Sequence, residues 1–421
     1  MDYKIYPPEE LTEGTVKLPL SKSESNRALI ISALTPGAEL PRQVADCDDT
    51  DVMLAALERT AGPVNVGAAG TAMRFLTAFY AVTPGCQVTL DGSERMRQRP
   101  IGALVDALRA LGADIEYLSK EGFPPLAVRG RMLEGGEVEI PASVSSQFIS
   151  ALLMVGPTME KGLKLHLKGR IISRPYIYMT LEMMTQAGAS VDFDENNQVV
   201  TVNPGRYSRP LPPVEADWSA ASYWFEIAAI SAEPVSLEGL RRQSLQGDSA
   251  VSRLFMVTGL EASWGSDGLL NLQLTPDAGD RLELDLTDTP DLTQTLAVTC
   301  CMLGLPFRFN GVESLKIKET DRLAALQMEL SKLGFILEVE DPGTLLWRGA
   351  RYEPEGEELE PIRTYDDHRM AMAFAPAAIF FPGLQINNCE VVSKSYPRFW
   401  SDLRAAGFTL EEVEKPIPGN D

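Results

Sequence analysis

The sequence has few of the residues that build metal centres and disulfide frameworks. It contains only two histidines, His166 and His368, which excludes a histidine-rich metal site. Its five cysteines are odd in number and irregularly spaced, and no Cys-x-x-Cys pair occurs. This usage argues against a zinc site or structural disulfides and is typical of a reducing compartment. We therefore expect no bound metal.

Long apolar runs are also missing. The longest, residues 371–384, is too short to cross a bilayer and contains two prolines. The first residues, 1–8, lack the pattern of a signal or transit peptide. We therefore expect a cytoplasmic protein with no membrane partner.

Basic residues are fewer than acidic ones. Lysine and arginine total 38 against 59 aspartate and glutamate residues, so the formal net charge is −21. Such a surface repels nucleic acid and anionic membranes. The conspicuous motifs are nevertheless basic, and a cationic pocket in an acidic protein favours a small anionic ligand over a polyanion.

A pattern of helix, glycine and two short strands recurs through the chain. The glycines that follow the predicted helices are separated by 76 (188 − 112), 71 (259 − 188), 75 (334 − 259) and 73 (407 − 334) residues. Such a period indicates one repeated supersecondary unit, and the alternating periodicities make that unit α/β. We expect each glycine to adopt the left-handed conformation after its helix. They are Gly112, Gly188, Gly259, Gly334 and Gly407.

About six such units fill 421 residues, more than one domain usually holds. The proline-rich stretch 210–213 lies near the midpoint and predicts a boundary between two domains of three units each. A second helix in each unit begins with glycine, hydroxyl or acidic residues. Since helix N-termini attract anions, we expect several of them to share a cleft.

The stretch from Pro19 to Arg27 combines helix-start signals with cations. Ser21 and Glu24 have the spacing of a capping box, Ser23 is a second candidate N-cap, and the helix continues to Ile31. Lys22 and Arg27 make this helix start suited to phosphate or carboxylate. The alternative is a capped surface helix with two solvated charges.

Three further stretches are rich in groups that bind anions. Residues 67–74 form a small-residue loop before an apolar helix, which either admits a ligand to backbone N–H groups or is a tight packing turn. Residues 95–99 place three arginines on a loop, at least one of which we expect to be solvated. Residues 145–147, Ser-Ser-Gln, open a helix with more donors than one N-cap requires.

Carboxylates accompany cations in the second half of the chain. A strand is expected to end at Lys318, and a helix to begin at Glu319 or Thr320 with four leucines facing inward, namely Leu323, Leu326, Leu330 and Leu333. Glu319, between Lys318 and Arg322, is a candidate acid or base, although a surface ion network gives the same letters. Asp291, after Pro290, is a candidate general base.

Two late motifs complete the set. Asp366-Asp367-His368-Arg369 precedes an apolar helix, and Lys394 stands between two serines. Carboxylates and cations without a P-loop or metal ligands indicate transfer chemistry on phosphorylated or carboxylated small molecules, by positioning, charge and proton transfer.

In this order the motifs resemble the 5-enolpyruvylshikimate-3-phosphate (EPSP) synthase family. The resemblance runs from Lys17 to about Trp400, and KETDRL with DDHRMAM and SKSESNR is its most specific part. It implies a two-domain, inside-out α/β fold of six βαβαββ repeats. Residues 1–20 with 215–421 would form domain one and residues 21–214 domain two, with the active site in the interdomain cleft.

The resemblance also implies the reaction. The family moves the enolpyruvyl group of phosphoenolpyruvate to the 5-hydroxyl of shikimate 3-phosphate through a tetrahedral intermediate, without a metal or cofactor. Asp291, Glu319, Lys22 and His368 would be catalytic. Shikimate 3-phosphate would contact Lys22, Ser23, Arg27, Ser145, Ser146, Gln147, Ser173, Tyr176, Asp291, Ser314 and Lys318. Phosphoenolpyruvate would contact Lys22, Gly70, Arg99, Gln147, Arg322, Arg369 and Lys394.

Three positions depart from the family pattern: Ala68 and Ser314 replace asparagines, and Phe75 replaces proline or leucine. Three other functions compete with this one. A UDP-N-acetylglucosamine enolpyruvyl transferase would use a loop cysteine, but none lies between Cys86 and Cys300. An RNA 3′-phosphate cyclase would be basic and use ATP, and a non-catalytic anion-binding protein would not need the retained charged groups. We expect a monomer, because the cleft requires one chain.

Overall fold

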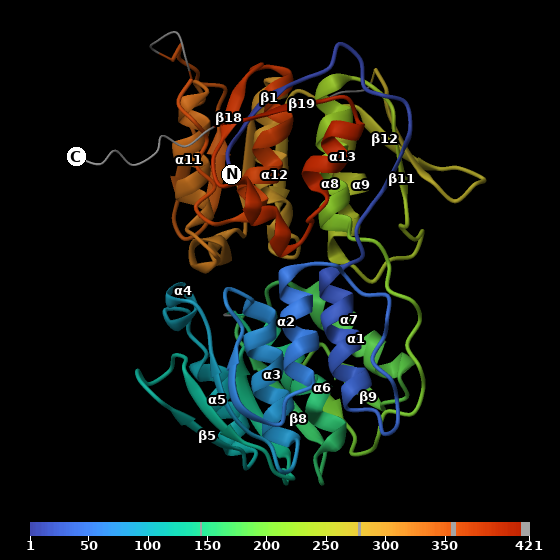
Figure 1. Ribbon diagram of the computed structural model, residues 1–421, viewed down its shortest axis with the longest axis vertical. Coiled ribbons are helices and arrows are strands. Elements are labelled where there is room, and N and C mark those ends of the chain that lie inside the picture. The colour runs from blue at the N-terminus through green and yellow to red at the C-terminus, as the bar shows by residue number, and fades with distance from the viewer. Residues whose placement is uncertain (144, 277–278, 355–358, 414–421) are drawn as a thin grey trace. The chain divides into compact units, whose positions relative to one another are not determined.

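The structure is a computed structural model that describes residues 1–143, 145–276, 279–354 and 359–413. It divides into two compact units, each with its own hydrophobic core (Figure 1). Unit 1 contains Met1–Pro19, Ala216–Ser244 and the chain from Asp248 on, whereas unit 2 contains Leu20–Glu215 and Leu245–Gly247. The predicted mixed α/β class is confirmed.

Unit 2 begins with two helices and continues with two βαβαββ segments. Its helices are α1 (Lys22–Ala33), α2 (Asp48–Leu57), α3 (Gly70–Val82), α4 (Glu94–Arg97), α5 (Gly102–Ala110), α6 (Ser146–Val155), the 3₁₀ turn η1 (Gly156–Thr158) and α7 (Arg174–Gln186). Its strands are β3 (Ala61–Asn65), β4 (Gln87–Asp91), β5 (Asp114–Tyr117), β6 (Leu126–Arg129), β7 (Gly136–Pro141), β8 (Leu163–Lys168), β9 (Val191–Asp194) and β10 (Val199–Val202).

The two sheets of unit 2 have the same topology. Their strand orders are β3-β4-β6-β5 and β7-β8-β10-β9. In each sheet the first two strands are parallel and the other pairings are antiparallel. The parallel strands are joined by a helix that packs in the core, α3 in one sheet and α6 in the other, and α3 is buried at every residue.

Unit 1 contains the remaining elements. Its helices and 3₁₀ turns are α8 (Trp218–Ser231), η2 (Gly247–Ala250), α9 (Val251–Leu254), η3 (Phe255–Thr258), η4 (Pro290–Leu292), α10 (Thr293–Leu303), η5 (Glu313–Ile317), α11 (Arg322–Lys332), α12 (His368–Phe374), η6 (Ala375–Ile379), η7 (Cys389–Lys394) and α13 (Phe399–Ala405). Its strands are β1 (Tyr3–Tyr6), β2 (Thr15–Lys17), β11 (Val235–Glu238), β12 (Leu260–Trp264), β13 (Leu270–Leu274), β14 (Leu282–Asp285), β15 (Phe307–Asn310), β16 (Glu338–Glu340), β17 (Thr344–Trp347), β18 (Leu384–Ile386) and β19 (Thr409–Glu412).

The first strands of the chain complete sheets whose other strands come much later. β2 pairs in parallel with β11, and α8 leads into β11 as the chain re-enters unit 1. β1 lies between β18 and β19, antiparallel to both. Ile362 forms a parallel bridge to Ile386 of β18, and β14 pairs in parallel with β15. The parallel-pair topology of unit 2 therefore recurs in unit 1.

The predicted glycine positions are confirmed, whereas one predicted strand is wrong. All five glycines have positive φ, between 80° and 104°. The four inward leucines of α11 are buried, at 0 to 1% exposure. The strand expected to end at Lys318 is instead the 3₁₀ turn η5, and α11 begins at Arg322, because the Asp321 carboxylate accepts the N–H groups of Leu323 and Ala324.

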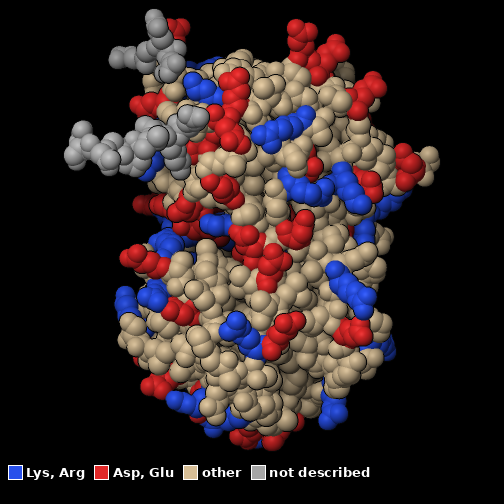
Figure 2. Space-filling view, in the orientation of Figure 1, with Lys and Arg blue, Asp and Glu red and all other residues tan. Residues whose placement is uncertain are grey.

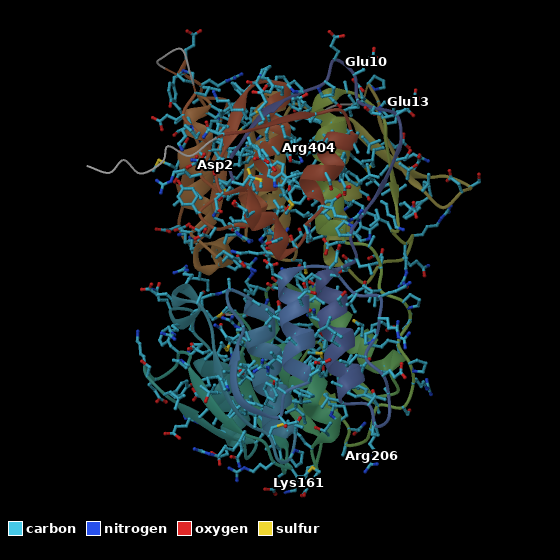
Figure 3. The ribbon with its side chains drawn as sticks, in the orientation of Figure 1. Asp2, Glu10, Glu13, Lys161, Arg206 and Arg404 are labelled. Carbon is cyan, nitrogen blue, oxygen red and sulfur yellow. The ribbon has the colours of Figure 1, made fainter. Side chains whose placement is uncertain are left out.

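The charged side chains are mostly at the surface. On the face drawn in Figure 2, acidic and basic side chains are interspersed. Labelled residues such as Lys161 and Arg206 of unit 2 are exposed (Figure 3). Within the described part of the chain, no helix has the length and apolar character needed to cross a membrane. The charged residues that are buried are the exceptions, and they include Arg27, Arg322 and Asp367.

Candidate functional site

The topology explains why residues distant in sequence meet. Neighbouring parallel strands end at the same edge of a sheet, so the loops that follow them leave from that edge. In the β14 and β15 pair, these loops carry Asp291 and the segment Lys318–Arg322. In the β3 and β4 pair, they carry Gly70 and Arg99. Each parallel pair therefore presents two helix starts together.

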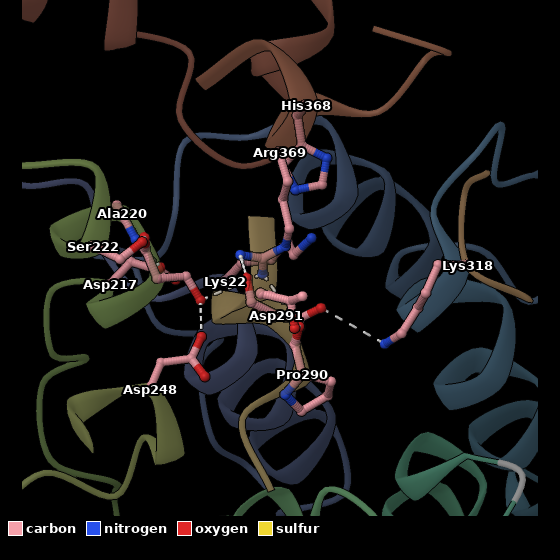
Figure 4. A network of polar contacts seen from close by, with 12 residues as sticks. Lys22, Asp217, Ala220, Ser222, Asp248, Pro290, Asp291, Lys318, His368 and Arg369 are labelled. Atoms are coloured by element: carbon pink, nitrogen blue, oxygen red, sulfur yellow. Dashed lines mark hydrogen bonds and ion pairs between the residues drawn. The ribbon is translucent and has the colours of Figure 1, made fainter. Parts of the chain in front are cut away.

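Arg322 is the centre of a charge cluster in unit 1. Its buried guanidinium donates to a carboxylate oxygen of Asp367 at 2.6 Å, of Asp291 at 2.8 Å and of Glu319 at 2.8 Å. Lys318 Nζ lies 3.8 Å from Asp291, and Arg369 Nη2 lies 3.3 Å from the other Asp291 oxygen (Figure 4). The predicted grouping of these side chains in one place is thus observed within this unit.

The charges of the cluster tune one another. Burial alone would raise the pKa of Asp291, but Arg369, Lys318 and Arg322 outweigh burial and hold that pKa well below its usual range. Asp291 raises the pKa of Lys318, yet burial and Arg322 together leave it below the ordinary lysine value. Asp291 is therefore an ionised but weakly basic carboxylate as long as its three cations face it.

The start of α12 supplies Arg369 and His368. Asp367 is the N-cap and accepts the Arg369 backbone N–H at 2.9 Å. His368 is buried, with Nδ1 3.8 Å from an Asp367 oxygen. Ile362, before α12, pairs in parallel with Ile386 of β18, so the loops that lead to α12 and to η7 leave the same edge of that sheet. Lys394 of η7 donates to the Asp366 carbonyl at 2.5 Å. Ser314 lies in η5, four residues before Lys318.

Helix α1 of unit 2 begins as predicted but is not a surface helix. The Ser21 hydroxyl accepts the Glu24 N–H at 3.4 Å, so Ser21 rather than Ser23 is the cap. In a reciprocal capping box the Ser21 N–H would donate to Glu24, but it donates to the Glu215 carbonyl at 2.8 Å, and the Glu24 carboxylate accepts the Glu215 N–H at 3.0 Å. Residues 24 to 31 are buried, which makes the solvated-helix alternative wrong. Lys22 lies 3.6 Å from Asp49, itself buried.

Arg27 is built into the interior of unit 2. Four of its N–H donors are used: they reach Thr180 Oγ1 at 2.7 Å, Ser150 Oγ at 3.1 Å, and two carbonyls. Those carbonyls belong to Ser23 and Tyr176, which the family resemblance places with Arg27 around shikimate 3-phosphate. The Phe75 ring lies 5.4 Å from its Cζ, so the departure at this position packs against the guanidinium. Burial lowers the pKa of Arg27 to about 10.

Gly70 and Arg99 are in direct contact. A Cβ added at Gly70 would lie 2.7 Å from Arg99 Nη1, so only glycine lets the guanidinium approach the start of α3 this closely. Buried Arg74 donates to the Gly70 and Pro100 carbonyls at 3.0 and 3.4 Å and so ties the arginine-bearing loop to α3. Arg97 pairs with Asp91 at the surface, which confirms that one of the three arginines is solvated.

The starts of α6 and α7 present hydroxyls. The Ser145 hydroxyl accepts the Gln147 N–H at 3.2 Å, while the Gln147 amide donates to Thr71 of α3 at 3.1 Å. Ser146 is buried. Ser173 precedes α7 with φ 52°, a conformation that costs a non-glycine residue free energy and that often occurs at functional sites. Tyr176 follows it and faces Arg27.

Several residues of these clusters escaped the sequence reasoning. They are Asp49, Thr71, Arg74, Ser219, Asp248 and Asp367; all contact predicted residues except Asp248, which is linked to Arg369 through Ser219. The available signal was that Asp49, Thr71, Ser219 and Asp367 lie within two residues of a helix start, whereas Arg74 lies one turn into α3 and Asp248 in a 3₁₀ turn. Among the described residues, no group of three or more His, Cys, Asp or Glu is arranged to hold a metal ion.

The model of the EPSP synthase (3-phosphoshikimate 1-carboxyvinyltransferase) family matches residues 6–62 and 58–403. The chain belongs to the EPSP synthase family. A relative named 3-phosphoshikimate 1-carboxyvinyltransferase from Bacteroides fragilis is 50% identical over 416 residues, covering 99% of this chain and all of the relative. One of the same name from Shewanella halifaxensis is 37% identical, covering 94% and 98%.

Solved structures of the same fold extend the family comparison. EPSP synthase from Acinetobacter baumannii superposes with a TM-score of 0.76 at 19% identity, over 98% of this chain and all of that one. The enolpyruvyl transferase NikO from Streptomyces tendae gives 0.72 at 15% identity, over 99% of both chains. At such low sequence identities these two similarities concern the fold alone. They confirm the fold class that the resemblance to the EPSP synthase family implied.

Proposed function

We propose that this chain transfers the enolpyruvyl group of phosphoenolpyruvate to the 5-hydroxyl of shikimate 3-phosphate and releases phosphate. The observation that carries the proposal is the cluster in which Asp291 and Glu319 share the Arg322 guanidinium. It offers one carboxylate for the attacking hydroxyl and another for the methylene carbon. The full-length relatives named for this transfer support it.

We assign the binding of the shikimate phosphate to unit 2. The hydroxyls and amide at the starts of α6 and α7 are neutral donors beside helix N-termini, a combination that suits a phosphate. They belong to Ser145, Ser146, Gln147 and Ser173. Arg27 has one N–H left beyond its four internal bonds, so its main part is to hold Ser23 and Tyr176 in place.

Phosphoenolpyruvate needs cations for both its phosphate and its carboxylate. Arg99 at the Gly70 turn and Lys22 would supply them from unit 2, and Arg322, Arg369 and Lys394 from unit 1. Guanidinium groups bind such oxygens in pairs. We propose that the two units act together on one pair of substrates and enclose them in a cleft.

The pKa of Asp291 links the binding of phosphoenolpyruvate to the activation of the acceptor hydroxyl. As an anion binds Arg369 and Arg322, it takes over part of the positive charge that now stabilises the Asp291 carboxylate. The pKa of Asp291 then rises from its depressed value, and the carboxylate becomes a stronger base when the acceptor hydroxyl is present. Lys318, with Ser314 nearby, would orient the acceptor hydroxyls.

The proposed reaction then has two balanced steps. The hydroxyl oxygen bonds to C2 of phosphoenolpyruvate as its proton passes to Asp291, and Glu319 gives a proton to C3. Glu319 then takes a proton back from C3 as the C2–O bond to phosphate breaks, which restores the double bond, and the proton held by Asp291 passes to the departing phosphate, so that both carboxyl groups regain their starting states. His368 would support the proton-transfer groups, and Lys22 would stabilise the charge on the departing phosphate. No cofactor enters either step.

We further propose a cytoplasmic monomer. Every assigned group belongs to one chain, and light scattering tests the monomer directly. The five cysteines are all free and buried, which is typical of proteins in reducing compartments.

Phosphate release by the purified protein tests the reaction. We expect release only when shikimate 3-phosphate and phosphoenolpyruvate are both present, with equimolar enolpyruvyl product detected by mass spectrometry. Release with UDP-N-acetylglucosamine as the acceptor, or none with either acceptor, would overturn the proposal. Glutamine at Glu329, a buried acid that pairs with Lys332 away from the cluster, is the matched control for substitutions of Glu319.

A further inference from the structure

Asp248 is a buried carboxylate outside the assigned site. It lies in η2, the turn after the chain leaves β11, and is 4% exposed. One carboxyl oxygen accepts the Ser219 hydroxyl, whereas the other has no hydrogen-bond partner among the described residues. A buried carboxyl group with an oxygen left bare costs free energy, so stability alone does not explain its presence.

Ser219 connects Asp248 to Arg369. Arg369 Nη2 lies 3.4 Å from Ser219 Oγ and donates to it, while the same hydroxyl donates to Asp248. The two hydrogen bonds therefore point in one direction, from guanidinium to hydroxyl to carboxylate, and such chains polarise each other. In Figure 4 the Arg369 side chain comes down from α12, with Asp291 below it and Asp248 to the lower left. Arg369 Nη2 serves both Ser219 and Asp291.

The topology gives the same connection a simple origin. β2 and β11 are parallel, so the segment after β2 and the loop that leads to η2 leave one sheet edge, and the start of α8 joins that edge where the Asp217 N–H donates to the Pro19 carbonyl at 2.8 Å. Ser219 is the second residue of α8 and Asp248 the second residue of η2. The pair is the counterpart in this sheet of the contacts between Gly70 and Arg99 and between Asp291 and Arg322.

We propose that Asp248 is a positioning residue that acts through Ser219 to hold the Arg369 guanidinium in the orientation needed to bind the carboxylate of phosphoenolpyruvate. The proposal rests on the proposed function of Arg369. Asp248 does not contact the substrate. It restricts the rotation of the Arg369 side chain before the substrate binds. Loss of Asp248 should therefore weaken phosphoenolpyruvate binding more than it slows turnover.

The charged groups around Asp248 make this role pH-dependent. Burial raises its pKa, as do the carboxylates of Asp291 and Asp217, while Arg369 and the Ser219 hydroxyl lower it, leaving a pKa of about 6. Below that pH the protonated acid no longer attracts the guanidinium through Ser219. The Michaelis constant for phosphoenolpyruvate should therefore rise as the pH falls from about 7 to about 5.

Steady-state kinetics of Asp248→Asn, Asp248→Ala and Ser219→Ala test the proposal once turnover by the wild-type protein is established. If the wild-type protein shows no turnover, that result contradicts the proposed function and not the role of Asp248. We expect the alanine variants to raise KM for phosphoenolpyruvate about tenfold or more, with kcat changed less. Asp248→Asn keeps an acceptor for Ser219, so it should raise KM less and abolish the rise toward low pH. The double variant Asp248→Ala with Ser219→Ala should be no worse than either single one.

A second measurement does not depend on activity. Carboxyl ¹³C NMR should show the pKa of Asp248 increasing when Arg369 is replaced by Gln and unchanged when Glu226, another buried acid of unit 1, is replaced by Gln. An unchanged KM in all three single variants, additive effects in the double variant, or a pKa indifferent to Arg369 would each overturn the proposal. Alanine variants with a lower melting temperature but a normal KM would mean a purely structural role.

Discussion

Replacing Gly70 by Ala should weaken phosphoenolpyruvate binding without unfolding unit 2. The added Cβ would lie 2.7 Å from Arg99 Nη1 and 3.0 Å from Nη2. Ordinary contact begins at 3.4 Å, so the guanidinium must retreat by roughly 0.7 Å (3.4 − 2.7). The atoms displaced are the free end of a flexible side chain rather than backbone, and alanine is the better helix former. The displacement is therefore a change in the site and not in the fold.

The size of the effect follows from what Arg99 does. A charge-assisted hydrogen bond contributes about 1.5–3 kcal/mol, and a guanidinium displaced from its best geometry should lose about half of that. KM for phosphoenolpyruvate should then rise about four- to thirteenfold, with the melting temperature essentially unchanged. Steady-state kinetics with varied phosphoenolpyruvate and a thermal scan measure both quantities.

Gly102 provides a matched control. It also is the first residue of a helix, but a Cβ there would meet its nearest atom, Gly122 Cα, at 3.4 Å. Gly102→Ala should therefore leave KM unchanged. In an Arg99→Gln background, Gly70→Ala should have no further effect. A KM increase that persists without Arg99, or that Gly102→Ala reproduces, would refute the reasoning.

Three other predictions concern single buried or reactive groups. Glu319→Gln should slow turnover by roughly 10²-fold or more while substrates still bind, as the loss of a general acid requires, and normal turnover would discredit that role. Glu226 is fully buried, and burial holds its pKa well above its usual value. The stability that its neutral form contributes is fully present below about pH 4.3 and is lost as the pH rises toward the folded-state pKa. Thermal scans from pH 5 to 9 should show stability falling with pH, and the fall should be shallower in Glu226→Gln; parallel curves would contradict this. Arg27→Lys should lower unfolding free energy by about 1–3 kcal/mol in denaturant titrations, because an ammonium cannot replace four guanidinium bonds, whereas Arg97→Lys at the surface should change nothing measurable.

The repeat and the helix starts could be read from the sequence because both are local. A glycine that must take positive φ after a helix, or a serine that caps one, leaves the same mark wherever the chain goes afterwards. The five glycines and the caps at Ser21 and Ser145 were predictable for this reason. The strand expected before Lys318 failed because alternating lysines and apolar residues also suit a 3₁₀ turn with one buried side, here that of Leu315.

Contacts across the chain were beyond the local pattern. No sequence signal joins β2 to β11, and none predicts that the Ser219 hydroxyl donates to Asp248. Nor could composition reveal that Arg27 would be spent largely on internal bonds, since a buried and an exposed arginine at a helix start have the same letters. The sequence identified the groups that carry charge, and the sheet topology determined which of them meet.

A crystal structure determined with shikimate 3-phosphate and phosphoenolpyruvate bound tests the central claim most directly. We expect one pair of ligands whose oxygens lie within hydrogen-bond distance of Ser173 and Lys22 of unit 2 and also of Lys318 and Arg369 of unit 1. Ligands bound by the residues of one unit alone, with the other cluster still closed on its own ion pairs, would contradict the account.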